Sequence, residues 1–190
     1  MSRHAPIKLS PTAVDLAIAR TSRRAASRRE MRLLHRSTIL ADEKVVAAGT
    51  ALFWLYARFG RRDRALVREA DHALAGVAIA VVTPHLLKHL FARERPDRTV
   101  GRGRPRGISH AGTAWDSFPS GHAINLGVMA GPIGRIVSRR WRFLVWPGLA
   151  ALAASRVLLL AHYASDVIAG LGLGVLIDKS LNRVMPPKKD

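Results

Sequence analysis

Hydrophobic residues in this chain fall into five blocks separated by polar, arginine-rich segments. The blocks lie at 45–57, 73–87, 123–134, 143–155 and 157–177. They contain no alternation of apolar and polar residues of the kind that marks half-buried strands, whereas glycine and alanine are frequent, as in closely packed helices. The pattern predicts an all-α protein built as a helical bundle.

Arginine-rich connectors bracket these blocks. Two are compact clusters at 58–64 and 139–142, and a longer basic stretch covers 93–106. Positive charge beside apolar segments, with Trp and Tyr near their ends, is typical of membrane proteins. We therefore predict an integral membrane bundle of about five to six transmembrane helices. It would form one membrane-embedded domain at 45–183, followed by a polar tail at 184–190.

The lengths of the blocks bear on this prediction. A spanning helix needs about 20 mainly apolar residues, and most of the blocks are shorter. They reach that length only if Lys88, Arg156, His162 and Asp166 lie inside or at the ends of helices. Ionisable residues in such positions usually face a polar cavity and mark a functional site. A soluble bundle with buried helices is the alternative that the pattern leaves open.

Residues 1–44 form a basic N-terminal arm with seven arginines between positions 20 and 36. Apolar residues recur at helical spacing over 11–20, which predicts an amphipathic helix. Such a helix would lie on anionic lipid headgroups at the membrane interface, or else form part of a solvated charged arm. The arm has no uninterrupted apolar segment typical of a secretory signal peptide.

Composition narrows the classes of function. The 190 residues include no cysteine, which excludes a disulfide-stabilised scaffold, a thiolate metal site and a cysteine nucleophile. The net charge of +18 suits either nucleic acid or anionic lipid headgroups as a partner. Aromatic residues make up only 6%, which is poor for base stacking, and hydrophobic residues make up 48%. We expect a membrane environment and no nucleic-acid partner.

Polar clusters interrupt the apolar blocks at three places. In the first, Lys88 and Arg95 are seven residues apart, so both project from nearly the same helix face, and Pro96 helps to end that helix. Two such cations can hold a phosphate or extend towards the lipid interface.

The second cluster is the turn Pro119-Ser120-Gly121-His122, which leads directly into the third block. It places backbone N–H groups at a helix start, where glycine lets an anion approach closely. Ser120 could equally serve as an ordinary N-cap.

The third cluster is Ser155-Arg156, followed by His162 and Asp166. His162 and Asp166 are four residues apart, so on a helix the carboxylate lies beside the imidazole. Such a pair supports a nucleophilic or basic histidine, or it makes a structural hydrogen bond. Taken together, the cations, the glycine turn and the His–Asp pair predict a site that binds an oxyanion.

In this order, the three clusters resemble the three-part signature of the type 2 phosphatidic acid phosphatase superfamily. The matching patterns are Lys88-x6-Arg95-Pro96, Pro119-Ser120-Gly121-His122 and Ser155-Arg156-x5-His162-x3-Asp166. Every signature position matches, over roughly residues 45–180. The resemblance implies metal-independent hydrolysis of a phosphate monoester or diphosphate on a membrane lipid. The reaction would pass through a phosphohistidine intermediate and need no cofactor and no metal.

The resemblance also implies a role for each residue. His162 would attack phosphorus, Asp166 would orient its imidazole, and His122 would protonate the leaving group and then activate water. Such a site acts by positioning and charge stabilisation. The residues that would hold the phosphate oxygens are Lys88, Arg95, Ser120, Gly121 and Arg156. The remaining histidines are interpreted as structural or incidental: His4, His35, His72, His85, His89 and His110.

Two other functions share parts of this pattern. Vanadate-dependent haloperoxidases have a similar site but are larger soluble proteins. A non-catalytic basic protein that binds membranes or nucleic acid would account for the charge alone. The lipid headgroup also stays open among phosphatidate-type lipids, phosphatidylglycerophosphate and isoprenoid phosphates.

For localisation, the resemblance implies a multi-pass protein of the cell membrane with its active site on the extracytoplasmic side. Five spans would place the arm on the side of the site and the C-terminus on the other side. The connectors at 58–64 and 139–142 then mark the non-catalytic side as cytoplasmic. The same charge rule disfavours a basic arm outside, which leaves open a sixth element in the arm or a cytoplasmic site.

Overall fold

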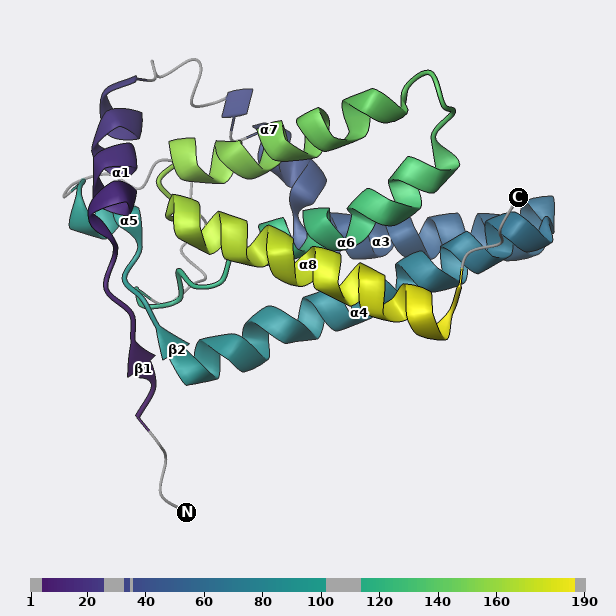
Figure 1. Cartoon of the computed structure of the whole chain (residues 1–190), viewed down its shortest axis with the longest axis horizontal. Helices are drawn as coiled ribbons and strands as arrows, with labels where there is room; N and C mark the ends of the chain where they lie inside the picture. The colour runs from purple at the N-terminus through teal and green to yellow at the C-terminus, as the bar shows by residue number, and fades with distance from the viewer. Residues whose placement is uncertain (1–4, 26–32, 35, 102–113, 187–190) are drawn as a thin grey trace.

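A computed structural model gives the structure of the chain, and it describes residues 5–25, 33–34, 36–101 and 114–186. Within these ranges the protein is mostly helical. Five helices run along the long axis of the molecule (Figure 1): α3 (Glu43–Leu55), α4 (Arg64–Leu90), α6 (Gly121–Ile136), α7 (Val145–Leu158) and α8 (Ala164–Val184). They correspond in order to the five apolar blocks, so the prediction of a helical bundle is confirmed.

The arm end of the bundle departs from a purely helical fold. Strand β1 (Ile7–Lys8) pairs in parallel with β2 (Phe91–Ala92). Helix α1 (Ala13–Ala25) packs beside α7 and α8, and α5 (Pro96–Thr99) lies close to it (Figure 1). Strands of two residues are too short to leave an alternating pattern in the sequence. They tie the described part of the arm to the bundle.

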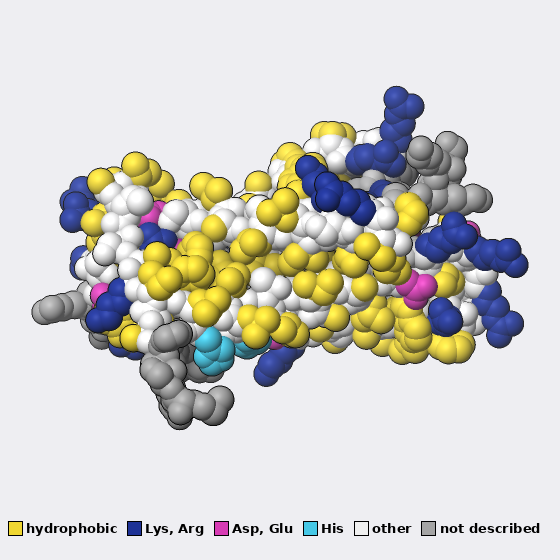
Figure 2. Space-filling view, turned by 60° about the horizontal axis from the view of Figure 1, so that its bottom comes forward, with side chains coloured by type: hydrophobic (Ala, Val, Ile, Leu, Met, Phe, Trp, Pro, Cys, Tyr) yellow, Lys and Arg dark blue, Asp and Glu magenta, His cyan; other side chains and the backbone are white. Residues whose placement is uncertain are grey.

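Arginine-rich turns lie at the opposite end of the bundle. A π-helical segment, η2 (Tyr56–Arg61), continues α3, and the 3-10 turn η3 (Arg142–Leu144) leads into α7. Asp63 then starts α4, because its carboxylate accepts from the N–H of Ala65 at 2.8 Å. Figure 2 shows hydrophobic side chains over the middle of one face and Lys and Arg mainly towards the two ends.

Glycine allows α6 and α8 to pack in backbone contact. A Cβ on Gly174 would lie 2.2 Å from the carbonyl oxygen of Ile124, and one on Gly127 would lie 2.4 Å from that of Leu171. Real Cβ atoms do not come this close, so only glycine fits at this crossing. The same approach continues towards the start of α6, where a Cβ on Gly170 would lie 2.6 Å from the carbonyl oxygen of Ser120.

A buried polar cluster joins α4, α6 and α8 nearer the other end. His72 Nε2 lies 2.8 Å from Asp178 Oδ1, and Arg135 pairs with Glu69 at 2.8 Å and with Asp178 at 3.6 Å. Buried ionisable groups persist when they are paired in this way. His72 thus has the structural role expected for it, whereas His4, His35 and His110 lie outside the described residues.

By length and composition, α4 is the one helix among the described residues that is long and apolar enough to cross a membrane. The core helix of a soluble protein can meet the same test. The exposed surface adds a second observation, since large hydrophobic side chains lie open on several helices: Leu52, Val82, Leu86, Trp146, Ile168 and Leu176. A surface of this kind suits lipid contact. The number of spans, expected to be five to six, stays a prediction.

We expect Gly174→Ala to lower the stability of the bundle. The added methyl group would meet the backbone of α6, and overpacking of this kind costs about 1–3 kcal/mol. The midpoint of thermal unfolding in detergent measures the effect. Gly172→Ala on the same helix is the matched control, because a Cβ there meets nothing within 4 Å. Equal midpoints for the two variants would contradict the close crossing.

Candidate active site

The structure brings the three sequence clusters together at the arm end of the bundle. Lys88 lies in the last turn of α4, Arg95 caps α5, and Ser120 caps α6. Arg156 lies in the last turn of α7. The second and third clusters are bonded directly, because the Ser120 N–H donates to the carbonyl oxygen of Asp166 at 3.3 Å.

Asp116 holds the two cations of the first cluster. Its carboxylate oxygens lie 2.8 Å from Arg95 Nε and 3.8 Å from Lys88 Nζ. Arg95 and Asp116 are largely buried and Lys88 is partly exposed. Asp116 therefore holds the two cations side by side. The expectation that both project from one helix is wrong, because α4 ends at Leu90 and Arg95 lies beyond it, before α5. Asp116 lies outside the signature, and nothing in its local sequence marks it for this role.

Ser120 acts as the N-cap of α6. Its hydroxyl accepts from the N–H of Ala123 at 3.4 Å, and its side chain is fully buried. Gly121 and His122 follow as the first two residues of the helix. The capping role considered for Ser120 is therefore present, and anion binding by this helix start stays a prediction.

The expected arrangement of His162 and Asp166 on one helix is wrong. Helix α7 ends at Leu158 and α8 begins at Ala164, so His162 lies in the connection between them. Leu160, with a φ of 57°, reverses the chain there. The four-residue spacing spans a turn and the start of a helix, and this moves the imidazole away from the place it would have in a continuous helix.

A backbone carbonyl, and not Asp166, bonds the ring of His162. The carbonyl oxygen of Ser117 lies 2.6 Å from Nδ1. A proton on Nδ1 then donates to this carbonyl and leaves the lone pair on Nε2, which has no hydrogen-bond partner among the described residues. The hydrogen bonds of the described chain join His162 to Asp166 only through Ser117.

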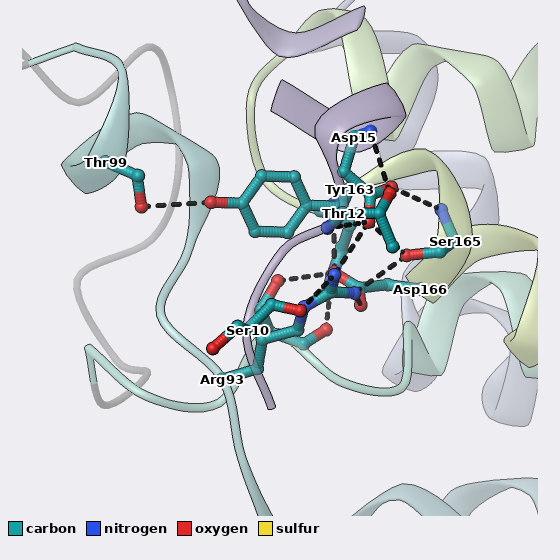
Figure 3. A network of polar contacts seen from close by, with 10 residues as sticks. Ser10, Thr12, Asp15, Arg93, Thr99, Tyr163, Ser165 and Asp166 are labelled. Atoms are coloured by element: carbon teal, nitrogen blue, oxygen red, sulfur yellow. Dashed lines mark hydrogen bonds and ion pairs between the residues drawn. The ribbon is translucent and has the colours of Figure 1, made fainter. Parts of the chain in front are cut away.

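Asp166 is the most enclosed charged group of the site. It accepts from the Ser117 hydroxyl at 2.6 Å and from the Tyr163 N–H at 2.9 Å. Its other oxygen pairs with Arg93, whose guanidinium also contacts Asp15 of α1 (Figure 3). Sequence reasoning missed Arg93, Asp15 and Ser117. Arg93 lies inside the first signature pattern, but its arginine-rich neighbours hide it, and Asp15 is 78 residues away.

Positive charge surrounds His162. Burial lowers the pKa of His162 well below its usual value, and the nearby cations Arg156 and Arg95 lower it further. The imidazole is therefore neutral at pH 7. Arg156 also has a buried Nε with no hydrogen-bond partner among the described residues. The unpaired N–H of Arg156 is free to donate a hydrogen bond to an anion that binds next to His162.

No metal site is evident in the part of the chain that the structure describes. No group of three or more His, Cys, Asp or Glu side chains there is arranged to hold a metal ion. The acidic residues near His162 are used by cations and hydroxyls of the protein.

Comparison with known families assigns the chain to one of them. A sequence model of the PAP2 superfamily, the type 2 phosphatidic acid phosphatases, matches residues 71–190. This chain belongs to the PAP2 superfamily. The matched range contains all three clusters, so the resemblance expected from the sequence is confirmed.

Relatives of known function share part of the chain. A lipid A 1-phosphatase of Rhizobium johnstonii is 35% identical over 103 residues, which is 52% of this chain and 40% of that protein. A decaprenylphosphoryl-5-phosphoribose phosphatase of Mycobacterium tuberculosis is 32% identical over 120 residues, 62% of each chain. The chain thus spans less than two thirds of the length of these relatives.

Two solved structures share the fold. LpxE of Aquifex aeolicus superposes with a TM-score of 0.74 at 15% identity, covering 93% of this chain and 99% of that one. A transmembrane PAP2 type phosphatidylglycerolphosphate phosphatase from Bacillus subtilis gives 0.66 at 19% identity, covering 90% and 83%. At this identity the likeness concerns the fold alone.

We expect His162 to titrate well below pH 6.5, the region where an ordinary histidine titrates. Its lowered pKa means that protons bind only at more acidic pH. Nuclear magnetic resonance of labelled histidine in detergent-solubilised protein measures this, with the His162 signal assigned by its loss in His162→Ala. A titration midpoint near pH 6.5 for that signal would contradict the buried, cation-lined setting.

Proposed function

We propose that this protein removes phosphate from a phosphate monoester or diphosphate of a membrane lipid, through a phosphohistidine on His162. Membership of the PAP2 superfamily and the names of the relatives, both lipid phosphatases, support this class of reaction. The observation that carries the mechanism is the geometry of His162, whose Nδ1 bonds the Ser117 carbonyl and whose Nε2 has no hydrogen-bond partner in the described chain.

In the first step, His162 Nε2 attacks phosphorus and the bond from phosphorus to the lipid oxygen breaks. His122, as the imidazolium in the complex with the anionic substrate, gives its proton to that departing oxygen and becomes neutral. Arg156, with its unpaired Nε, and the cations Lys88 and Arg95 balance the charge spread over the phosphoryl oxygens. Ser120 and the N–H of Gly121 would add donors at the start of α6.

In the second step, water attacks the phosphohistidine. His122 now accepts a proton from the water, the bond from nitrogen to phosphorus breaks, and inorganic phosphate leaves with neutral His162 restored. Asp166 supports both steps from a distance, because it holds Ser117, whose carbonyl fixes the ring of His162. Three protein cations stabilise the transferred group in this mechanism, which therefore uses no metal ion.

The membrane supplies the substrate in this proposal. Exposed hydrophobic side chains lie over the middle of one face of the bundle (Figure 2). The site lies at one end of the bundle, where a lipid headgroup would meet it. We propose that residues 45–183 form the membrane-embedded domain. On α1, the exposed Val14 and Ile18 lie beside exposed arginines, which suits an interfacial helix on anionic headgroups.

Phosphate release by detergent-purified full-length protein, with EDTA present, tests the activity. The panel contains phosphatidate, phosphatidylglycerophosphate, lipid A 1-phosphate and polyprenyl mono- and diphosphates. We expect release from at least one lipid, loss of release in His162→Ala, and a decrease of roughly 10²–10⁴-fold in His122→Ala, because a general acid is lost. Vanadate, a phosphate analogue, is expected to inhibit.

His89→Ala is the matched control for these variants. His89 lies in the last turn of α4 beside Lys88, but its side chain is exposed. Its replacement should leave phosphate release unchanged. Full activity in folded His162→Ala would overturn the nucleophile, and inhibition by EDTA would overturn the metal-independent mechanism.

We further propose five spans with the site on the extracytoplasmic side of the cell membrane. The described arm and the site share one end of the bundle, and α8 ends at the other, which also carries the arginine-rich turns η2 and η3 (Figure 1). Reporter fusions at the two termini are therefore expected in opposite compartments, with the C-terminus cytoplasmic. Termini on the same side would favour six spans and contradict this arrangement.

A further inference from the structure

We propose that helix α1 of the N-terminal arm is part of the catalytic apparatus, in which Asp15 and Arg93 are positioning residues for the nucleophile. The chain of contacts runs from Asp15 through Arg93, Asp166 and Ser117 to His162. This inference rests on the proposed function, since it assigns residues that tune the same site.

Arg93 lies between two buried carboxylates, with 5% of its side chain exposed. Its Nη2 is 2.7 Å from Asp15 Oδ2, and its Nη1 donates to Asp166 Oδ1 and, at 2.8 Å, to Ser165 Oγ (Figure 3). The guanidinium also stacks on the ring of Tyr163, 4.6 Å from its centroid. A planar group with several fixed donors can bind two carboxylates in this way, and lysine cannot.

Asp15 connects the starts of two helices. With Thr12 it forms a reciprocal cap of α1, with both bonds at 3.1 Å. It also accepts from the N–H and the hydroxyl of Ser165, at 3.1 and 2.8 Å, in the first turn of α8. Burial raises the pKa of Asp15, but hydrogen bonds from Ser165, Thr12 and Arg93 outweigh it and lower the pKa to about 2. Asp15 is therefore charged wherever the protein is folded near neutral pH.

The charges of this network depend on one another. Asp15 and Asp166 are 2% and 0% exposed, and Arg93 is the cation that contacts both. Removing one partner of a buried pair leaves an uncompensated charge, which is costly. Asp15 therefore fixes the orientation in which Arg93 meets Asp166.

Arg93 also reaches the nucleophile through its backbone. The Ser117 N–H donates to the carbonyl oxygen of Arg93 at 3.0 Å, and the Ser117 hydroxyl donates to Asp166. Ser117 is thus held at two points by this network, and its carbonyl binds His162 Nδ1. A shift of Arg93 would turn the imidazole, and a misplacement of about 1 Å can cost roughly 10²-fold in rate.

Asp15→Asn tests the proposal in the full-length protein. The change keeps the size of the side chain and removes its charge. We expect kcat to fall about ten- to a hundredfold with KM nearly unchanged, because the phosphate-binding cations are not altered. Arg93→Lys should show the same pattern. Asp15→Asn in the Arg93→Lys background should add little, since both changes break one chain of contacts.

Arg20→Gln and Arg24→Gln are the matched controls. Both arginines lie on α1 with exposed side chains, so these variants remove arm charge and spare Asp15. They should keep the wild-type kcat. If they lower kcat as strongly as Asp15→Asn, or if Asp15→Asn lowers the unfolding midpoint while kcat stays at the wild-type value, the positioning role is wrong.

A second measurement needs no turnover. The Nδ1 proton signal of His162 reports its bond to the Ser117 carbonyl, and we expect it to shift in Asp15→Asn and to stay in place in Arg20→Gln. If the signal shifts in Asp15→Asn but the wild-type protein hydrolyses none of the lipids, the positioning chain stands and the proposed reaction is wrong. An unmoved signal in an active enzyme would overturn the positioning chain alone.

Discussion

The backbone contact between α6 and α8 is the constraint on which the site depends. Gly127, Gly170 and Gly174 let the two helices approach until carbonyl oxygens of one lie where side chains of the other would be. At the site end, this approach allows the Ser120 N–H to bond the carbonyl of Asp166. The helix start that carries His122 is thereby set beside the turn that carries His162, without any side chain between them.

Buried charge is the second constraint. The site end holds a cation-rich face that suits an anion, and behind it Asp166 lies fully enclosed. An enclosed carboxylate requires donors on all its oxygens, and here Arg93, Ser117 and Tyr163 provide them. Those donors come from three separate segments, so satisfying one buried group also fixes the relative positions of the segments around His162.

The position of the arm follows from the same electrostatic need. Arg93 requires a second carboxylate, and Asp15 of α1 supplies it from the start of the chain. The parallel pair of β1 and β2 holds the arm next to Arg93. A basic segment that could have served only for lipid contact therefore also contributes to the buried network, and its exposed face remains available for anionic headgroups.

The sequence by itself determined the five helices, the grouping of the three clusters and the family. These depend on local features: apolar runs long enough for helices and signature residues at fixed spacing. It also indicated that Ser120 could cap α6, because an N-cap is decided within one turn.

The tertiary structure alone decided how the nucleophile is held. The spacing of His162 and Asp166 suggested a direct pair on one helix, but the helix starts only at Ala164, and Ser117 stands between the two groups. Asp15, Arg93 and Asp116 carry no local signal, since an ion pair between distant segments leaves no periodicity or spacing in the sequence. Such contacts exist only after packing excludes water, when each buried charge must find a partner wherever the fold provides one.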